Sequence, residues 1–351
     1  MITQIQNLSA QTIALIRAKD WWSYKLAPVL GTAYAIAAIS DISLISLWST
    51  FLFLLVALVI GASYASVINN ICDREADKIS GKTNYFVGQS HIFIALALIG
   101  CILPGLIVSG LLIQIPLALS IYIGNWLIFT VYSLPPIRLK NRSFLGGLAI
   151  AVGESLVPQI LAIFLVAHYT GQTLSLILIT AISIWAFASG LRSIFWHQIL
   201  DFENDSLAGV NTFAVNASTQ TLQRIGKWLV FPIEFASLIA ILFLTNNLFN
   251  WIFLCLYFVT EWLRYYFWQL DIVIVQPTNN SRLILFEYYD VFYPLGFLIL
   301  SSCKHPESLI ILAAHLLIYY QRLWWWLKDF WYLFRWGIMQ SFLNYRQLLK
   351  M

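Results

Sequence analysis

Apolar stretches of roughly twenty residues follow one another along most of this sequence, and they constrain its fold more than any other feature. A helix needs about 20 apolar residues to cross the hydrocarbon core of a bilayer. We therefore predict an all-α polytopic membrane protein with about nine or ten transmembrane helices. The stretches lie near 24–41, 44–69, 91–112, 115–133, 144–167, 173–198, 226–245, 248–268, 284–302 and 306–322.

The composition also favours a membrane protein and argues against other classes. Apolar residues make up 60% of the 351 residues and charged residues only 10%, which is too little charge to cover a soluble domain of this length. The net charge of +4 is small and scattered, so membrane lipids are expected partners and nucleic acid is not. The four cysteines match no zinc or redox spacing, and we expect free thiols.

The N-terminal segment lacks the compact apolar core of a cleaved signal peptide. Residues 1–20 mix polar and apolar positions and include Arg17, Lys19 and Asp20. Aromatic residues follow within 21–24, where they would form a belt at the membrane surface. We predict an interfacial helix over residues 1–20 that leads into the first span.

Basic residues are concentrated in alternate connections between the spans, which predicts the orientation of the chain. The connections after the second, fourth, sixth and eighth spans carry them, and the opposite connections contain almost none, Lys304 being the exception. The positive-inside rule then places both termini in the cytoplasm, as expected in a bacterial-type inner or cell membrane. The basic residues on this side are Arg17, Lys19, Lys25, Arg74, Lys78, Lys82, Arg138, Lys140, Arg142, Arg224, Lys227, Arg282, Arg322, Lys328, Arg335, Arg346 and Lys350.

Two aspartate motifs end the second and sixth spans on this same side. Asn69, Asp73 and Asp77 recur every four residues, so a helix places all three on one face. Asp201 and Asp205 repeat that spacing. Each motif follows the second helix of what would be a four-helix half, which predicts two four-helix-like halves that face each other around a central cavity.

Carboxylate pairs that face each other across a cavity suit magnesium chemistry. Mg²⁺ prefers hard oxygen ligands and is commonly held by one or two carboxylates plus the phosphates of a substrate. Two such pairs would hold magnesium around one diphosphate and make it a good leaving group. The alternative is that these are loop charges paired with nearby Lys and Arg. Two matched sets near membrane depth, where charge is costly, favour a functional role.

A proline-containing loop between the fourth and fifth spans is a third feature of this side. Pro135 and Pro136 stop the helix and fix an extended turn. Arg138 and Lys140 alternate with apolar residues after it, so both could point toward a phosphate-bearing cavity. Spacing alone favours the alternative, a basic loop that only flanks the membrane.

With these three features in order, the chain resembles the UbiA superfamily of intramembrane prenyltransferases. The family's first motif, N-x-x-x-D-x-x-x-D, is matched at 69–77, and its second, D-x-x-x-D, at 201–205. The family's Y-S-x-P-P-x-R-L-K loop is similar to residues 132–140, and its A-G-V-x-T tail to residues 208–212.

The resemblance implies a helical bundle around a central cavity that opens laterally to the lipid. It also implies transfer of an isoprenoid group from a (poly)prenyl diphosphate donor to a small aromatic or other nucleophilic acceptor. Mg²⁺ would be the cofactor, and loss of diphosphate would leave an allylic cation. Residues 21–302 would form this domain, and residues 303–351 would add a C-terminal span and a basic, aromatic interfacial helix.

The residues themselves and the resemblance together give a set of expected site residues. Metal binding and catalysis would fall to the motif aspartates Asp73, Asp77, Asp201 and Asp205. The residues expected to contact the substrates are Asn69, Asn70, Lys82, Tyr132, Arg138, Lys140, Arg192 and Gln198.

The chain departs from the family pattern beside both motifs. An Arg-Pro pair does not follow the first motif, and Asn211 stands where members commonly have Lys or Arg. His197 and Gln198 stand where many members carry Asn before the second motif. Two expected cationic contacts to diphosphate are thus absent, and the residues that would compensate are Lys82, Arg138, Lys140 and Arg192.

Polar residues inside the spans allow two interpretations each. Arg192 would contact the diphosphate or pair with Glu154 or another carboxylate. Glu154 and Gln159 would line an acceptor site or form hydrogen-bonded core groups. His197 would be a base on the acceptor or a core histidine. A last group is expected to pair internally or to edge the cavity: Glu261, Arg264, Glu287 and Asp290.

Two other functions fit the same features. A terpene cyclase of this type would use the same cavity and metals without an external acceptor. A non-catalytic isoprenoid-lipid binder or transporter would use membrane carboxylates for ions or substrates. Magnesium-dependent diphosphate release distinguishes both enzymes from the binder, and a cyclic product formed without an acceptor distinguishes the cyclase.

Overall fold

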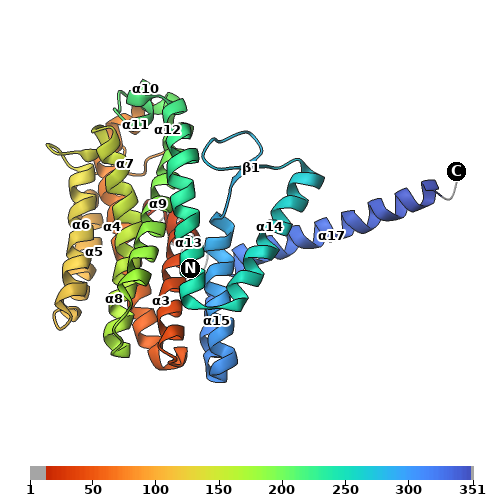
Figure 1. Ribbon diagram of the computed structural model, residues 1–351. Coiled ribbons are helices and arrows are strands. Elements are labelled where there is room, and N and C mark those ends of the chain that lie inside the picture. Colours follow the sequence, from red (N-terminus) through yellow and green to blue (C-terminus); the bar gives the residue numbers. More distant parts are fainter. Residues whose placement is uncertain (1–12, 349–351) are drawn as a thin grey trace, which may run out of the picture.

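The computed structural model describes the backbone of residues 13–348 and the side chains of residues 13–335. Within these residues the fold is helical apart from two short strands, which confirms the predicted all-α class. Most helices run side by side in one bundle, and α17 (Tyr320–Leu348) extends from it at a steep angle (Figure 1). Most of the interfacial helix expected over 1–20 lies outside the described residues.

The elements follow the apolar stretches closely. From the N-terminus they are α2 (Ala18–Trp21), η1 (Trp22–Leu26), α3 (Ala27–Ile39), η2 (Leu44–Leu47), α4 (Trp48–Ile79), α5 (His91–Leu111), α6 (Pro116–Ser133), η3 (Leu139–Asn141), α7 (Phe144–Ile150), η4 (Ala151–Leu156), α8 (Val157–Thr170) and α9 (Leu176–Leu200). The remaining elements are α10 (Phe202–Leu207), α11 (Phe213–Ala217), α12 (Thr219–Ile225), η5 (Gly226–Val230), α13 (Phe231–Thr245), α14 (Leu248–Trp268), β1 (Asp271–Val273), β2 (Ser281–Leu283), η6 (Tyr288–Phe292), α15 (Tyr293–Lys304), η7 (Pro306–Ser308), α16 (Leu309–Ile318) and α17.

Six helices of the described chain are long and apolar enough to cross a membrane. They are Leu44–Ile79, His91–Leu111, Pro116–Ser133, Phe144–Thr170, Leu176–Leu200 and Thr219–Thr245. The expected count of nine or ten is not confirmed. Helices do form at the other stretches, but α3, α15 and α16 have only 13, 12 and 10 residues, and α14 carries Glu261 and Arg264.

The side of α5 that faces away from the bundle is covered with bare apolar side chains. Leu96, Leu103 and Leu106 are each more than half exposed. Such a surface is unfavourable in water and suits the hydrocarbon core of a bilayer. With the six apolar helices, it identifies an integral membrane protein.

Within residues 13–348, four helices contain a π-helical turn directly before a proline. The turns η1, η4, η5 and η6 precede Pro28, Pro158, Pro232 and Pro294, and each proline is the second residue of the α-helix that follows. Proline has no N–H group, and its ring clashes with the carbonyl four residues earlier, so a wider turn relieves the conflict. The helices therefore continue past these prolines.

A connection of nineteen residues (269–287) between α14 and η6 holds a small structure that the sequence did not predict. The strands β1 and β2 pair in parallel within it, with Asp271 opposite Ser281. The loop packs back onto the bundle, because the Val275 side chain is 2% exposed and lies against Gly226 at the start of η5.

Candidate active site

The first aspartate motif lies on the last turns of α4. The helix continues to Ile79, well past its apolar part, because no glycine or proline lies between Gly61 and Gly81, and Gly81 follows its end with φ +69°. Asp73 is buried and Asp77 half-buried. The predicted common face of Asn69, Asp73 and Asp77 thus exists as one helical face.

Two basic residues of the proline-containing loop bind Asp73. Arg138 Nη2 donates to Asp73 Oδ1 at 3.0 Å, and Lys140 Nζ donates to the other carboxylate oxygen. The two cationic side chains are only about a quarter exposed (26% and 20%), so water screens the pairs incompletely. The loop of the third feature therefore lies against the first motif, as expected if it serves the same site.

Asp77 is held by a residue that the sequence did not single out. Asn84, in the loop after α4, donates through Nδ2 to Asp77 Oδ2 at 2.8 Å and to the Asn70 carbonyl at 2.8 Å. Asn70 itself donates its side-chain amide to the Leu15 carbonyl at 3.4 Å. An isolated asparagine in a loop carries no sequence signal of such a role.

The second motif lies where α9 passes into α10. Asp201 separates the two helices, but the hydrogen bonds from Asp201 N to His197 O (2.9 Å) and from Asp205 N to Asp201 O (2.8 Å) keep the helical path. Asp201 and Asp205 therefore remain one turn apart. Burial raises the pKa of Asp205 above its ordinary value, and the Lys82 charge acts in the opposite direction.

Lys82 links the two motifs. It follows the first motif in the loop after α4, and its Nζ lies 3.1 Å from Asp201 Oδ2. The ends of α4 and α9 therefore lie within reach of one lysine side chain. The structure brings together both aspartate motifs and the predicted cations Lys82, Arg138 and Lys140.

Two other predicted contacts have different surroundings. Gln198 is buried, and its side-chain oxygen accepts from Ala214 N at 3.3 Å, so it ties the tail of the second motif to α9. Tyr132 is half-buried and packs against the same buried apolar cluster as Ile71 and Cys72 of the first motif's helix. The tail of the second motif (residues 208–212) is also held by Ser143 N, which donates to the Asn211 carbonyl at 2.9 Å.

Arg192 lies apart from both motifs in a fully buried ion pair. Its Nε and Nη2 donate to the two carboxylate oxygens of Glu234 on α13, both at 2.6 Å. Nη1 donates to the Ile274 carbonyl at 3.0 Å, and Nη2 to the Ile284 carbonyl at 2.9 Å. Of its two interpretations, this is pairing with a carboxylate, and the partner is Glu234.

A cavity lies along α9 below the second motif. Ser189 and Ser193 of α9 line it, and Ser193 lies about two helical turns before Asp201. The half-buried pair of Lys25 and Glu154 (Nζ to Oε2, 3.2 Å) also lines it. The complete lining is Tyr24, Lys25, Pro28, Val29, Glu154, Ser155, Gln159, Trp185, Ala186, Ser189, Ser193, Phe286, Tyr289 and Asp290.

The charged residues of this cavity come from π-helical turns. Lys25 lies in η1, Glu154 in η4 and Asp290 in η6. Gln159 also reaches the cavity, and its buried side-chain oxygen has no hydrogen-bond partner among the described residues. Glu154 and Gln159 thus line a cavity, and their role at an acceptor site stays a prediction.

The acidic and basic residues of the last helices pair among themselves, as one of the two sequence interpretations expected. Arg264 contacts Glu261 and Glu287, and it also reaches Asp329 on α17 at 2.8 Å. Asp290 is the exception, because it pairs with Arg322 of α17 and also lines the cavity.

The motif residues fit magnesium when a phosphate ligand completes the site. Among the described residues, no three His, Cys, Asp or Glu side chains are grouped as a metal site on their own. Each motif supplies two carboxylates one helical turn apart, and Mg²⁺ often takes only one or two carboxylates and completes its shell with water and substrate phosphates. The hard oxygen donors and the neighbouring cations are those that a magnesium diphosphate requires.

Comparisons with known proteins agree on one family. The model of the UbiA prenyltransferase family matches residues 26–282. A UbiA homologue from Archaeoglobus fulgidus solved with DMAPP and Mg²⁺ is 15% identical, with a TM-score of 0.54, over 83% of this chain and 99% of that one. The same homologue solved with GPP and Mg²⁺ is 16% identical, with a TM-score of 0.53 and the same coverage. No significant match is found among curated proteins. The resemblance inferred from the motifs is confirmed, and this chain belongs to the UbiA prenyltransferase family.

Proposed function

We propose that this protein transfers an isoprenoid group from a prenyl diphosphate to a small nucleophilic acceptor, with Mg²⁺ as cofactor. One observation carries the proposal. The motif carboxylates Asp73 and Asp201 are paired with cations from two different loops at the same end of the bundle. A complex of metal and diphosphate needs carboxylates that bind the metal and cations that bind the phosphate oxygens, and this site offers both.

The ion pairs explain how the site would exist before and after substrate binds. Without substrate, Lys82, Arg138 and Lys140 neutralise the motif carboxylates, which would otherwise repel one another at a partly buried site. A magnesium diphosphate offers new partners to both groups. The carboxylates bind the metal, and the three cations bind phosphate oxygens.

The chemistry would be an ionisation followed by capture. The bond between the first isoprenoid carbon and the diphosphate oxygen breaks, and its electron pair leaves with the diphosphate. The acceptor then attacks the allylic cation with its own electron pair and releases one proton. Bound Mg²⁺ would supply Lewis-acid stabilisation of the leaving diphosphate, and Asp73, Asp77, Asp201 and Asp205 would hold it.

The cavity supports the placement of the isoprenoid chain. It lies along α9, about two helical turns before Asp201, and beside its charged groups it has apolar and aromatic walls that include Val29 and Trp185. Such walls bury a hydrocarbon chain and exclude water from the cation. The A. fulgidus homologue has been solved with DMAPP and GPP in the presence of Mg²⁺, which supports an isoprenoid diphosphate as the donor class.

We further propose that the motif end of the bundle faces the cytoplasm. Basic residues crowd this end, among them Arg74, Lys78 and Arg142 beside the site residues. The opposite connections are almost free of them. The positive-inside rule then gives a multi-pass protein whose donor site opens to the cytoplasmic pool of diphosphates.

The test is pyrophosphate release by the purified protein in lipid nanodiscs, with geranyl diphosphate as donor and product mass read in parallel. We expect release that requires Mg²⁺, stops with EDTA, and falls by about 100-fold or more in Asp73→Asn and Asp201→Asn. Asp41→Asn is the matched control, because Asp41 lies at the opposite end of the bundle, where it binds Lys304 at 2.9 Å.

Three outcomes would contradict the proposal or redirect it. Pyrophosphate release that continues in EDTA, or in the two motif variants, would contradict a magnesium site at the motifs. A cyclic hydrocarbon formed without an acceptor would assign the cyclase instead. Lipid binding without any turnover, or ion flux in liposomes, would assign the binder or transporter.

A further inference from the structure

The segment after α15 lies across the boundary between η1 and η6, which we call the seam. We call η7, α16 and the part of α17 whose side chains are described (together residues 306–335) the C-terminal arm. On one side of the seam, the Trp22 Nε1–H group donates to the Ile318 carbonyl at 3.5 Å, and the Trp22 and Tyr319 rings are 6.0 Å apart. On the same side, the Arg322 guanidinium lies 4.4 Å above the Tyr24 ring.

The arm also contacts η6, on the other side of the seam. Arg322 Nη2 donates to Asp290 Oδ2 of η6 at 2.6 Å, and Asp290 is only 3% exposed. Arg322 thus reaches η1 through Tyr24 and η6 through Asp290 at the same time. One residue of the arm bridges the two elements.

This seam is a wall of the cavity described above. Tyr24 and Lys25 of η1 line the cavity on one side of it, and Tyr289 and Asp290 of η6 line it on the other. Between these two elements the cavity is bordered by the arm, because Arg322 contacts both Tyr24 and Asp290.

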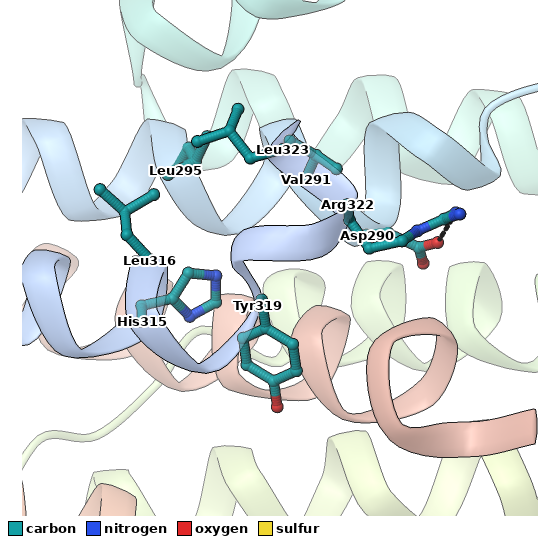
Figure 2. A pocket seen from close by; sticks show the side chains of 8 residues that line it. All are labelled: Asp290, Val291, Leu295, His315, Leu316, Tyr319, Arg322 and Leu323. Carbon is teal, nitrogen blue, oxygen red and sulfur yellow. Dashed lines mark hydrogen bonds and ion pairs between the residues drawn. The ribbon is translucent and has the colours of Figure 1, made fainter. Parts of the chain in front are cut away.

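A second, smaller pocket lies on the arm side of the same wall. Asp290 lines both pockets, so the Asp290–Arg322 pair separates the cavity from the arm. Figure 2 shows these two side chains pointing toward each other, with Leu295, Leu316 and Leu323 on the other side of the pocket. Past the ion pair, the pocket is lined mainly by apolar and aromatic side chains that would tolerate a hydrocarbon chain.

The arm is fixed in this position by a second set of ion pairs. Asp329 on α17 accepts from the buried Arg264 at 2.8 Å and from Arg282 at 3.5 Å. Breaking a buried ion pair leaves an uncompensated charge and is costly. The arm therefore covers the seam as a constant part of the structure.

We propose that the C-terminal arm closes the cavity between η1 and η6, and that Arg322 and Tyr319 limit the length of the isoprenoid chain that the protein accepts. This rests on the proposed function, since it assumes that the cavity receives the chain of a prenyl diphosphate. It assigns a specificity role to a segment that lies beyond the matched family region, which ends at residue 282.

The test compares binding of geranyl and geranylgeranyl diphosphate with Mg²⁺ to the full chain in nanodiscs. In Arg322→Ala and Tyr319→Ala, we expect the affinity for the longer donor to rise at least about tenfold relative to the shorter one, because more methylene groups are buried. Affinity for geranyl diphosphate should stay unchanged. Arg322→Lys keeps the charge and should stay near the native ratio.

Arg282→Gln is the matched control, because Arg282 also binds the arm through Asp329 but does not line either pocket. An unchanged ratio in both Arg322→Ala and Tyr319→Ala would overturn the inference, and so would an equal rise in Arg282→Gln. If Arg322→Ala does not fold, as judged by size-exclusion chromatography, Tyr319→Ala alone decides. If the native protein binds neither donor, this would contradict the proposed function itself and, with it, the inference.

Discussion

Lys82 Nζ lies 3.1 Å from Asp201 Oδ2, so the loop that follows the first motif is tied to the carboxylate that begins the second. The two residues are far apart in the sequence and belong to different motifs. Their contact places both motifs in one site and gives Lys82 two possible partners, the aspartate and a bound diphosphate.

Substitution of Lys82 should therefore affect the donor more than the folded protein. We expect Lys82→Ala to raise the donor KM about tenfold, since one charge-assisted contact to phosphate is lost, with a smaller change in kcat. Steady-state pyrophosphate release measures both. Lys78→Ala is the control, because Lys78 is exposed and has no ion pair within the described residues. An unchanged donor KM would show that Lys82 does not contribute to donor binding.

Asn84 should matter through the metal. Its amide donates to Asp77 Oδ2 at 2.8 Å and so holds the orientation of that carboxylate. We expect Asn84→Ala to raise the Mg²⁺ concentration for half-maximal activity about tenfold, as loss of a group that orients a metal ligand typically does. A magnesium titration measures it, with the exposed neighbour substitution Thr83→Ala as control. Identical titration curves for the two variants would refute the role.

The Arg192–Glu234 pair should govern stability. We expect Arg192→Met to destabilise the protein by about 3–5 kcal/mol, because Glu234 is left charged and buried, and Arg192→Met with Glu234→Leu to recover part of the loss. Thermal unfolding in detergent, followed by tryptophan fluorescence, measures both. A single variant that unfolds like the native protein but binds the donor weakly would instead place Arg192 at the diphosphate.

Close helix packing beside the cavity gives a further prediction. A Cβ added at Gly190 of α9 would lie 2.6 Å from Ser155 Oγ and 3.1 Å from the Ala151 carbonyl of η4. We expect Gly190→Ala to cost about 1–3 kcal/mol of stability by overpacking. Gly124→Ala in α6 is the matched control: nothing lies within 4 Å of its added Cβ, so it should gain up to about 1 kcal/mol. Equal unfolding temperatures for the two variants would contradict this.

Local patterns in the sequence predicted what depends on local spacing. Apolar stretches marked the helices, and the four-residue repeats placed Asp73 with Asp77 and Asp201 with Asp205. The basic loop is different: the spacing of Arg138 and Lys140 favoured a loop that only flanks the membrane, and a role beside the first motif was implied by the family resemblance. For the helices and the aspartate repeats, both the sequence pattern and the structure involve neighbours along the chain.

The parts that could not be predicted depend on distant partners. Glu234 is 42 residues from Arg192, and Asn84 bonds Asp77 across a loop without periodicity. The span count was not confirmed for a related reason. Hydropathy marks apolar stretches, but packing and charges such as Glu261 decide which of them form long apolar helices.

The π-helical turns make the chemistry of the cavity depend on helix length as well as on side chains. A π turn holds about one residue more than an α-helical turn, so the residues after it are rotated by about 100° relative to those before it. Deleting one residue from η4 would therefore replace, in one step, the whole set of groups that this helix offers to the cavity, Glu154 included. A single codon gained or lost beside Pro158 is thus enough to present a different surface to the cavity, without any new side chain.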